Sequence, residues 1–405
     1  MKILHTADWH LGKKLYNKSR HEEQVQVLEE IISITEENNI DVVVVAGDIF
    51  DNANPSADSQ SLFYKTVKRL AADGKRPVII IAGNHDSPEK IEAPHPLAKE
   101  CGIIMAGFPD SKASISSYGG NFEILRSGEG FFELKIENVA YNLRVILTPY
   151  PNELTLKRIF TAQNLEQEIK LNLNEMWGNQ ISNFDENGVN IMVAHLFCSD
   201  LNGVEPVEGD DEKSVRLGPA GVIESSLLPD GLHYAALGHI HKLMRIEGKG
   251  YPVYYSGSPL NYSLREERRD NFVLIVEANP GMVTKVDKVK LNSGKKIYRK
   301  TFTSLEEAEE WLLANQDIWV ELNLKLTRPL TSDESNRLSK IHEGIITLNL
   351  EIISELLEAQ VSVIDVTKSP IELFESFYTS EREGRLPSEE LKKLFSEILD
   401  REEEL

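Results

Sequence analysis

Five apolar runs in this chain each end in residues that can bind a metal ion, and this pattern most constrains the fold. The runs with their polar ends read KILHTADWH, DVVVVAGDIFD, PVIIIAGNHD, NIMVAHLF and YAALGHIH. Short runs rich in Val and Ile, bounded by turn residues, are typical of buried strands in a parallel sheet. Ligands of such sheets bind beyond the carboxyl ends of the strands. We therefore expect the five polar ends to meet at one site.

Helical patterns separate the first three runs. Val25, Leu28 and Ile31 recur at helical spacing, and residues 56–72 repeat the pattern after Pro55. Alternation of strand and helix at this length is typical of units with a parallel sheet.

The rest of the chain divides into further segments. Residues 110–150 read as short antiparallel strands, and residues 165–177 read as a helix. We place a first domain at residues 1–280 and a second, with two helices and strands at 318–327 and near 361–367, at residues 281–369. Residues 370–405 form an acidic helical tail with apolar positions.

The side chains at the five ends supply only oxygen and imidazole nitrogen. The candidate ligands are Asp8, His10, Asp48, Asn84, His195, His239 and His241. This donor set suits Mn²⁺, Fe²⁺, Co²⁺ or Zn²⁺ better than a metal that prefers thiolates. Seven side chains are too many for one tetrahedral ion, whereas two ions sharing one carboxylate would use all of them. One such histidine alone is more often a polar residue without a metal, but five such ends together favour a metal site.

Composition limits the partners and the compartment. Cys101 and Cys198 are the only cysteines, which suits a reducing cytoplasm, and no apolar run is long enough to span a membrane. A net charge of −21 argues against a nucleic-acid partner at first, because such partners select basic surfaces. Residues 301–405 carry −14 of that charge, however, and bound cations would add positive charge at the site.

The motifs DWH, GDIFD, GNHD, AHL and GHIH, in this order, resemble the calcineurin-like metallophosphoesterase superfamily. More narrowly, MKILHTADWHLGKKLY, VAGDIFDNANPS, IAGNHDSPEK, ALGHIHK and YSGSP resemble the family of bacterial nuclease subunits that work with a coiled-coil ATPase of the SbcC type. The resemblance implies an α/β fold, a four-layer α-β-β-α sandwich with a smaller α+β capping domain and a C-terminal helical tail.

The resemblance also implies roles for the site residues. One Mn²⁺ would be held by Asp8, His10, Asp48 and His241, and a second by Asp48, Asn84, His195 and His239. His85 would stabilise the transition state or protonate the leaving 3′ oxygen. Asp51 falls where related phosphatases place a carboxylate that orients this histidine.

Partners follow from the same resemblance. The expected substrates are double-stranded DNA ends and hairpins, and the tail would dock on the ATPase through residues 371–399. Residues 56–72 are a candidate homodimer surface, with ordinary packing on the sheet as an equal alternative. Candidate phosphate contacts are Lys13, Lys14, Lys18 and Arg20, and also Arg265, Arg268 and Arg269.

Three functions remain open at this point. The preferred one is a Mn²⁺-dependent DNA nuclease, both exonuclease and hairpin endonuclease, in DNA repair and recombination. A small-molecule phosphoesterase would explain residues 1–265 equally well but gives no role to the capping domain and tail. A scaffold without metal is the third, and the full ligand set with His85 argues against it.

Overall fold

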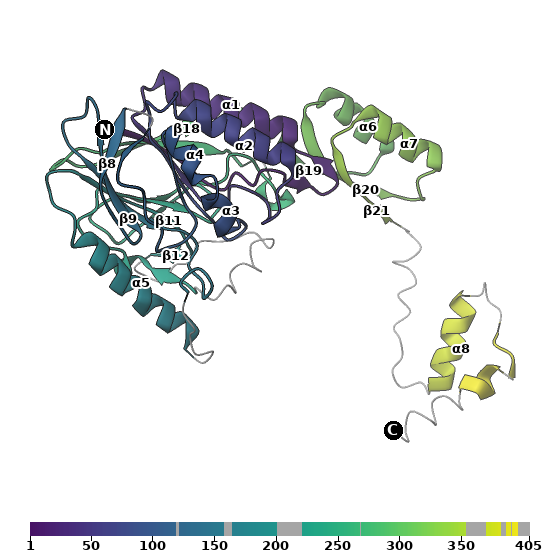
Figure 1. Ribbon diagram of the computed structural model, residues 1–405. Helices are drawn as coiled ribbons and strands as arrows, with labels where there is room; N and C mark the ends of the chain where they lie inside the picture. Colours follow the sequence, from purple (N-terminus) through teal and green to yellow (C-terminus); the bar gives the residue numbers. More distant parts are fainter. Residues whose placement is uncertain are drawn as a thin grey trace.

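Two β-sheets packed face to face form the centre of the molecule, with helices outside them (Figure 1). The structure is a computed structural model. It describes residues 1–118, 121–157, 164–200, 221–267, 269–353, 370–381, 386–389 and 391–395.

The first sheet contains the first three of the predicted strands. Its strand order is β18 (Lys285–Lys290), β17 (Phe272–Glu277), β1 (Lys2–Thr6), β4 (Val42–Ala46), β5 (Val78–Ile81) and β6 (Ile103–Ala106). From β1 to β6 the pairings are parallel, whereas β17 and β18 are antiparallel. The sheet thus continues beyond residue 280, where the sequence placed the end of the first domain.

The second sheet contains the other two predicted strands, again parallel and side by side. Its order is β15 (Met244–Ile246), β16 (Val253–Tyr255), β14 (Tyr234–Gly238), β11 (Val189–His195), β10 (Leu143–Thr148), β9 (Phe131–Ile136), β8 (Phe122–Gly128) and β7 (Ser117–Tyr118). β7 to β9 pair in antiparallel fashion, as expected for residues 110–150.

Alternate residues of the first-sheet strands enter two different cores. In β4, Val42 and Val44 pack between the two sheets, whereas Val43 and Val45 face the helices α1 (His21–Glu37) and α2 (Ala57–Leu70). Both faces are buried, which explains why the strand reads as an unbroken apolar run.

The outer face of the second sheet is covered in the same way by α5 (Leu165–Ile181). Trp177 of α5 packs there and donates a hydrogen bond to Thr148 Oγ1 at 3.0 Å. The order of layers is therefore helix, sheet, sheet, helix, and the expected four-layer sandwich is confirmed (Figure 1).

A smaller α/β unit follows, and we call residues 296–352 the cap. It has β20 (Ile318–Leu326) between β19 (Lys296–Phe302) and β21 (Ile345–Ile352), all parallel, with α6 (Leu305–Ala314) and α7 (Ser332–Ile341) as connections. Strand β21 was not predicted. The strand predicted near 361–367 lies outside the described residues.

Shorter elements complete the description. They are β2 (Lys14–Leu15), β3 (Lys18–Ser19), α3 (Pro88–Glu92), α4 (His95–Glu100), β12 (Cys198–Ser199), β13 (Ile223–Glu224), the 3₁₀ turns Ser225–Leu227 and Leu264–Glu266, and α8 (Pro370–Glu381) in the tail. Among the described helices, none combines the length and the apolar character needed to cross a bilayer.

Candidate metal centre

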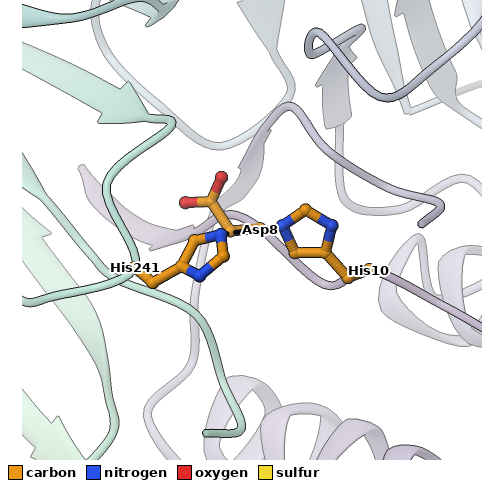
Figure 2. A group of neighbouring side chains, drawn as sticks. All are labelled: Asp8, His10 and His241. Carbon is orange, nitrogen blue, oxygen red and sulfur yellow. Dashed lines mark hydrogen bonds between the residues drawn. The ribbon is translucent and has the colours of Figure 1, made fainter. Parts of the chain in front are cut away.

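Side chains after β1 and β14 form a first group of metal-binding type, which we call group one. It consists of Asp8, His10 and His241, all buried, whose ligand atoms lie within 4.8 Å of one another (Figure 2). The two Nε2 atoms of His10 and His241 are 2.9 Å apart. Two imidazole nitrogens at this distance share either a proton or a cation, because two lone pairs alone would repel.

A second group lies at the ends of β5, β11 and β14, and we call it group two. Asn84 Oδ1 is 3.0 Å from His195 Nε2 and 2.9 Å from His239 Nδ1. Asp48 Oδ2 lies between the groups, 3.6 Å from His10 Nε2 and 3.5 Å from His195 Nε2. Metal bonds of about 2.0–2.2 Å place ligand atoms about 3–3.5 Å apart. The structure thus brings all seven expected ligands together in an arrangement that suits two ions near a shared aspartate.

The backbone at these ends adopts conformations that side chains rarely allow. Asp8, His10, Asp48 and His239 have φ values of 54°, 44°, 49° and 103°. Such residues persist only where the surroundings hold them, and they cluster at functional sites. Here the loops hold one another, since Asp8 N donates to Gly47 O and His10 N donates to Asp48 O, each at 3.0 Å.

Two glycines make room for His195. A Cβ on Gly47, whose φ is +88°, would lie 2.3 Å from His195 Nδ1, and a Cβ on Gly238 would lie 1.8 Å from Ala46 O. His195 Nδ1 is 2.8 Å from Ala46 O, so it donates its proton there and leaves the Nε2 lone pair for a metal.

Buried charge makes the site suitable for a cation. Asp8 Oδ1 accepts the His239 backbone N–H at 2.9 Å, whereas its Oδ2 is buried with no hydrogen-bond partner among the described residues. Burial, aided by Asp48, raises the pKa of Asp8 to about 6. Burial lowers the pKa of His239 to about 3, so this imidazole is neutral. Burial also disfavours charge on His195, but Asp48 and Asp8 outweigh it and raise its pKa to about 9. A divalent cation would neutralise the buried carboxylates of Asp8 and Asp48 more fully than the single extra proton on His195 does.

His85 stands at the same edge without joining either group. Its backbone N–H donates to Asp48 Oδ1 at 2.9 Å, and its Nδ1 is 2.8 Å from the backbone carbonyl of Asp51. The sequence led us to expect the Asp51 carboxylate at this position. The hydrogen bond comes from the Asp51 carbonyl, but the carboxylate stays close: one of its oxygens lies within 4.8 Å of a ring nitrogen of both His85 and His10, and its Oδ1 is 3.6 Å from Lys13 Nζ. A role for the Asp51 carboxylate in orienting His85 stays a prediction.

Two buried carboxylates that support the site were not predicted. Asp86 accepts the backbone N–H groups of Ile49, Phe50 and Gly83 at 2.9–3.1 Å and so ties the loop after β5 to the loop after β4. Glu266 Oε1 lies 3.6 Å from His241 Nδ1. The sequence carried a signal for each of these two carboxylates. Asp86 is the aspartate of GNHD, and Glu266 ends SLRE, a capping box in which a serine and a glutamate cap each other's backbone N–H.

The candidate phosphate contacts have different surroundings. Arg20 is 1% exposed and pairs with Glu23, so the expectation that it contacts DNA is wrong. Arg269 is partly buried and pairs with Glu266 at 2.9 Å. Lys14 is exposed, Lys13 is partly exposed beside the Asp51 carboxylate, and Arg268 lies outside the described residues.

Metal binding at this site is predicted to depend on pH. Protons compete with the cation, so affinity for Mn²⁺ should fall as the pH drops below about 9, where His195 takes up a proton, and fall further through about 6, where Asp8 does. At pH 7.5 a hundred-fold excess of Mn²⁺ over its Kd should stabilise the fold by about 2.7 kcal/mol per ion. Differential scanning fluorimetry with and without EDTA measures this. An equal stabilisation at pH 5.0 and pH 7.5 would contradict the prediction.

Replacing the shared aspartate should affect both metal positions. We expect Asp48→Ala to lower occupancy in both groups, because its Oδ2 lies between His10 and His195. Metal per chain after reconstitution and desalting is counted by mass spectrometry, with Asp58→Ala on the exposed first turn of α2 as the control. Loss of a single ion would show that Asp48 does not bridge.

Comparisons with known proteins show what the chain is similar to. The family described as "Calcineurin-like phosphoesterase" matches residues 1–243. A Bacillus subtilis (strain 168) protein, named as a subunit of the nuclease SbcCD, is 34% identical, covering 100% of this chain and 99% of that protein. A protein of the same name from Staphylococcus epidermidis is 28% identical, covering 99% of this chain and 100% of that protein. A solved dimetal phosphatase from Danio rerio aligns over 71% of this chain and 98% of its own, at 14% identity and a TM-score of 0.36.

The family match covers the strands whose ends carry all seven candidate ligands, and the similarity to the Bacillus subtilis protein runs the full length of the chain. On this evidence, the chain belongs to the calcineurin-like phosphoesterase family.

Proposed function

We propose that this protein is a Mn²⁺-dependent nuclease that hydrolyses phosphodiester bonds at double-stranded DNA ends and hairpins, in DNA repair and recombination. The observation that carries the proposal is the pair of ligand groups joined by Asp48, with His85 beside them. The full-length similarity to proteins named as subunits of the nuclease SbcCD supports DNA as the substrate.

The site residues divide the chemistry between them. Asp8, His10, Asp48 and His241 would hold one ion, and Asp48, Asn84, His195 and His239 the other. When bound, two such ions supply a nucleophile from water at neutral pH and neutralise charge on the phosphate. The rest depends on the protein, which fixes the ligands through the crossed backbone hydrogen bonds of the loops.

His85 is the residue we assign to the leaving oxygen. Because Nδ1 donates its proton to the Asp51 carbonyl, the ring is fixed in orientation and Nε2 is the atom that can carry a proton to the 3′ oxygen. Lys13 lies on the same side of the site. Its Nζ is near the Asp51 carboxylate and the Tyr262 ring, but the side chain stays partly exposed and can therefore contact a phosphate oxygen.

Partners of the protein are inferred from its surfaces. In the tail, Phe374 of α8 stacks on Phe395 at 4.2 Å between ring centroids, while Phe377 and Leu394 remain 64% and 53% exposed. Such exposed apolar side chains suit docking on the coiled coil of an SbcC-type ATPase. We also propose a cytoplasmic homodimer through α1 and α2, which border a surface hollow of about 750 Å³.

DNA cleavage is the direct test of the proposed function. With Mn²⁺ and an SbcC-type ATPase, the protein should degrade linear duplex DNA and open hairpins, and gel electrophoresis of end-labelled substrates would show both. Bis-p-nitrophenyl phosphate hydrolysis is measured in parallel. Efficient ester hydrolysis without any DNA cleavage would favour a small-molecule phosphoesterase. Failure to retain metal would favour a scaffold.

His85 can be tested apart from metal binding. We expect His85→Gln to lower kcat for DNA cleavage by about 100-fold or more, the usual contribution of general acid catalysis. The metal content should stay at the wild-type level, because the backbone N–H that holds Asp48 remains. His95→Gln, on α4, is the matched control. Unchanged cleavage by the His85→Gln protein would remove His85 from the mechanism.

A further inference from the structure

The cap contacts the first domain at a buried ion pair, Arg20–Glu23. The next residue in the chain, Gln24, contacts the backbone of the candidate metal ligand His10. Arg20 and Glu23, at the start of α1, are 1% and 5% exposed and make two parallel hydrogen bonds, from Nε to Oε1 and from Nη2 to Oε2. A buried pair of this kind is costly to desolvate, so its geometry and further partners decide what it contributes.

The further partners of Glu23 belong to the cap and to the segment leading into it. Trp319 of β20 donates its indole N–H to Glu23 Oε1 at 2.9 Å, and the backbone N–H of Lys295 donates to Glu23 Oε2 at 2.6 Å. The Trp319 ring is 7% exposed and also lies 5.8 Å from the Arg20 guanidinium. Glu23 therefore fixes the cap against the first turn of α1.

Gln24, the next residue of the first turn of α1, holds the loop that carries the group-one ligand His10. Gln24 is buried, donates from Nε2 to His10 O at 2.9 Å, and accepts from Gly12 N at 3.1 Å. A single side-chain amide thus holds the loop that carries His10 at two points. A shift of this helical turn would move His10 with it.

A second connection runs from Arg20 to His241. Arg20 Nη1 donates to Asn261 O at 2.6 Å, and the neighbouring backbone N–H of Tyr262 donates to Glu266 Oε2 at 2.5 Å. The other oxygen of Glu266 faces His241 Nδ1 at 3.6 Å. Both connections therefore end on the two histidines whose Nε2 atoms are 2.9 Å apart in group one.

Group two is held by different elements. His195 Nδ1 bonds to Ala46 O of β4, and His195 and His239 both approach Asn84 Oδ1 of the loop after β5. These contacts stay within the two central sheets and their loops. The cap contacts through Glu23 thus lead to His10 and His241, which belong to group one alone, and they reach the shared Asp48 through the hydrogen bond from His10 N to Asp48 O.

We propose that Glu23 and Trp319 are positioning residues, which couple the placement of the cap to metal binding in group one. The inference rests on the proposed metal centre. When the cap is docked through Glu23, His10 and His241 are held at the separation that one ion requires. When that contact is lost, group one binds its ion more weakly while group two keeps its own.

Trp319→Phe tests this coupling, because it removes the N–H donor and keeps an aromatic ring and the Arg20–Glu23 pair. The matched control is Trp311→Phe. Trp311 also belongs to the cap, but its ring contacts are to Tyr298 and Phe302, both within the cap. Mn²⁺ titration followed by electron paramagnetic resonance should show one ion bound about ten-fold more weakly or more, since one hydrogen bond to a charged group is worth at least about that factor. The other ion and the control should match the wild type.

Two further measurements sharpen the assignment. In a His10→Asn background, Trp319→Phe should cause no additional change in Mn²⁺ affinity, since the coupled position is already lost. Hydrolysis of bis-p-nitrophenyl phosphate by Trp319→Phe should fall at limiting Mn²⁺ and recover in excess Mn²⁺. If the phenylalanine variant fails to fold, Gln24→Met, which removes the amide contacts to the loop, should give the same selective weakening.

Three outcomes would overturn the coupling. Wild-type Mn²⁺ binding by Trp319→Phe together with reduced DNA cleavage would mean that the contact only holds the cap for DNA. Equal weakening of both ions would indicate a general loosening of the site. An additional loss in the His10→Asn background would place the effect elsewhere. Absence of DNA cleavage by the wild type would instead count against the proposed function, because Mn²⁺ titration and ester hydrolysis use no DNA.

Discussion

The arrangement of this protein depends on burying carboxylates where two sheets end together. Asp8 and Asp48 are 0% and 2% exposed, and each would be strongly disfavoured in such a place without positive charge nearby. Histidines from both sheets surround them, and the loops that carry them exchange backbone hydrogen bonds. The strained φ values at the ligands are tolerated because the strands that precede these loops are closely packed in the core between the two sheets. The fold therefore supplies the rigidity, and bound cations would supply the compensating charge.

Much of this could be predicted from the sequence, because the governing patterns are local. A run such as DVVVVAGD specifies a doubly buried strand and places its polar end at the carboxyl edge, whatever lies around it. Parallel strands share that edge, so five such runs predict one site without further information. The order of layers follows from helical segments between the strands, and α1, α2 and α5 lie where those patterns indicated.

What could not be predicted depends on contacts between distant segments. Arg20 reads as a surface charge in KSRHEE, but Glu23, Asn261 and Trp319 enclose it, and two of these three residues lie more than 200 positions away. The hydrogen bond to His85 Nδ1 comes from the Asp51 backbone carbonyl, which a sequence pattern of side chains does not specify, although the carboxylate also lies within 4.8 Å of the ring. Strand β21 is different, because TLNLEI alternates polar and apolar residues, the pattern of a half-buried strand, so its signal was present in the sequence and was overlooked.

The acidic composition of the chain bears on how phosphate would be attracted. Basic residues near the site are mostly engaged: Arg20 and Arg269 face buried glutamates, and Lys13 is beside Asp51. At the junction with the cap, Lys290 is likewise paired with Asp270. These pairs neutralise much of the charge of Lys13, Arg20 and Arg269, whereas Lys242, directly after His241, is exposed. Bound divalent ions would add to the few lysines there as positive charges facing a phosphate, which links recognition of the scissile bond to metal occupancy. Any contact that tunes metal binding at His10 and His241, as the Glu23 junction is placed to do, would then tune substrate binding as well.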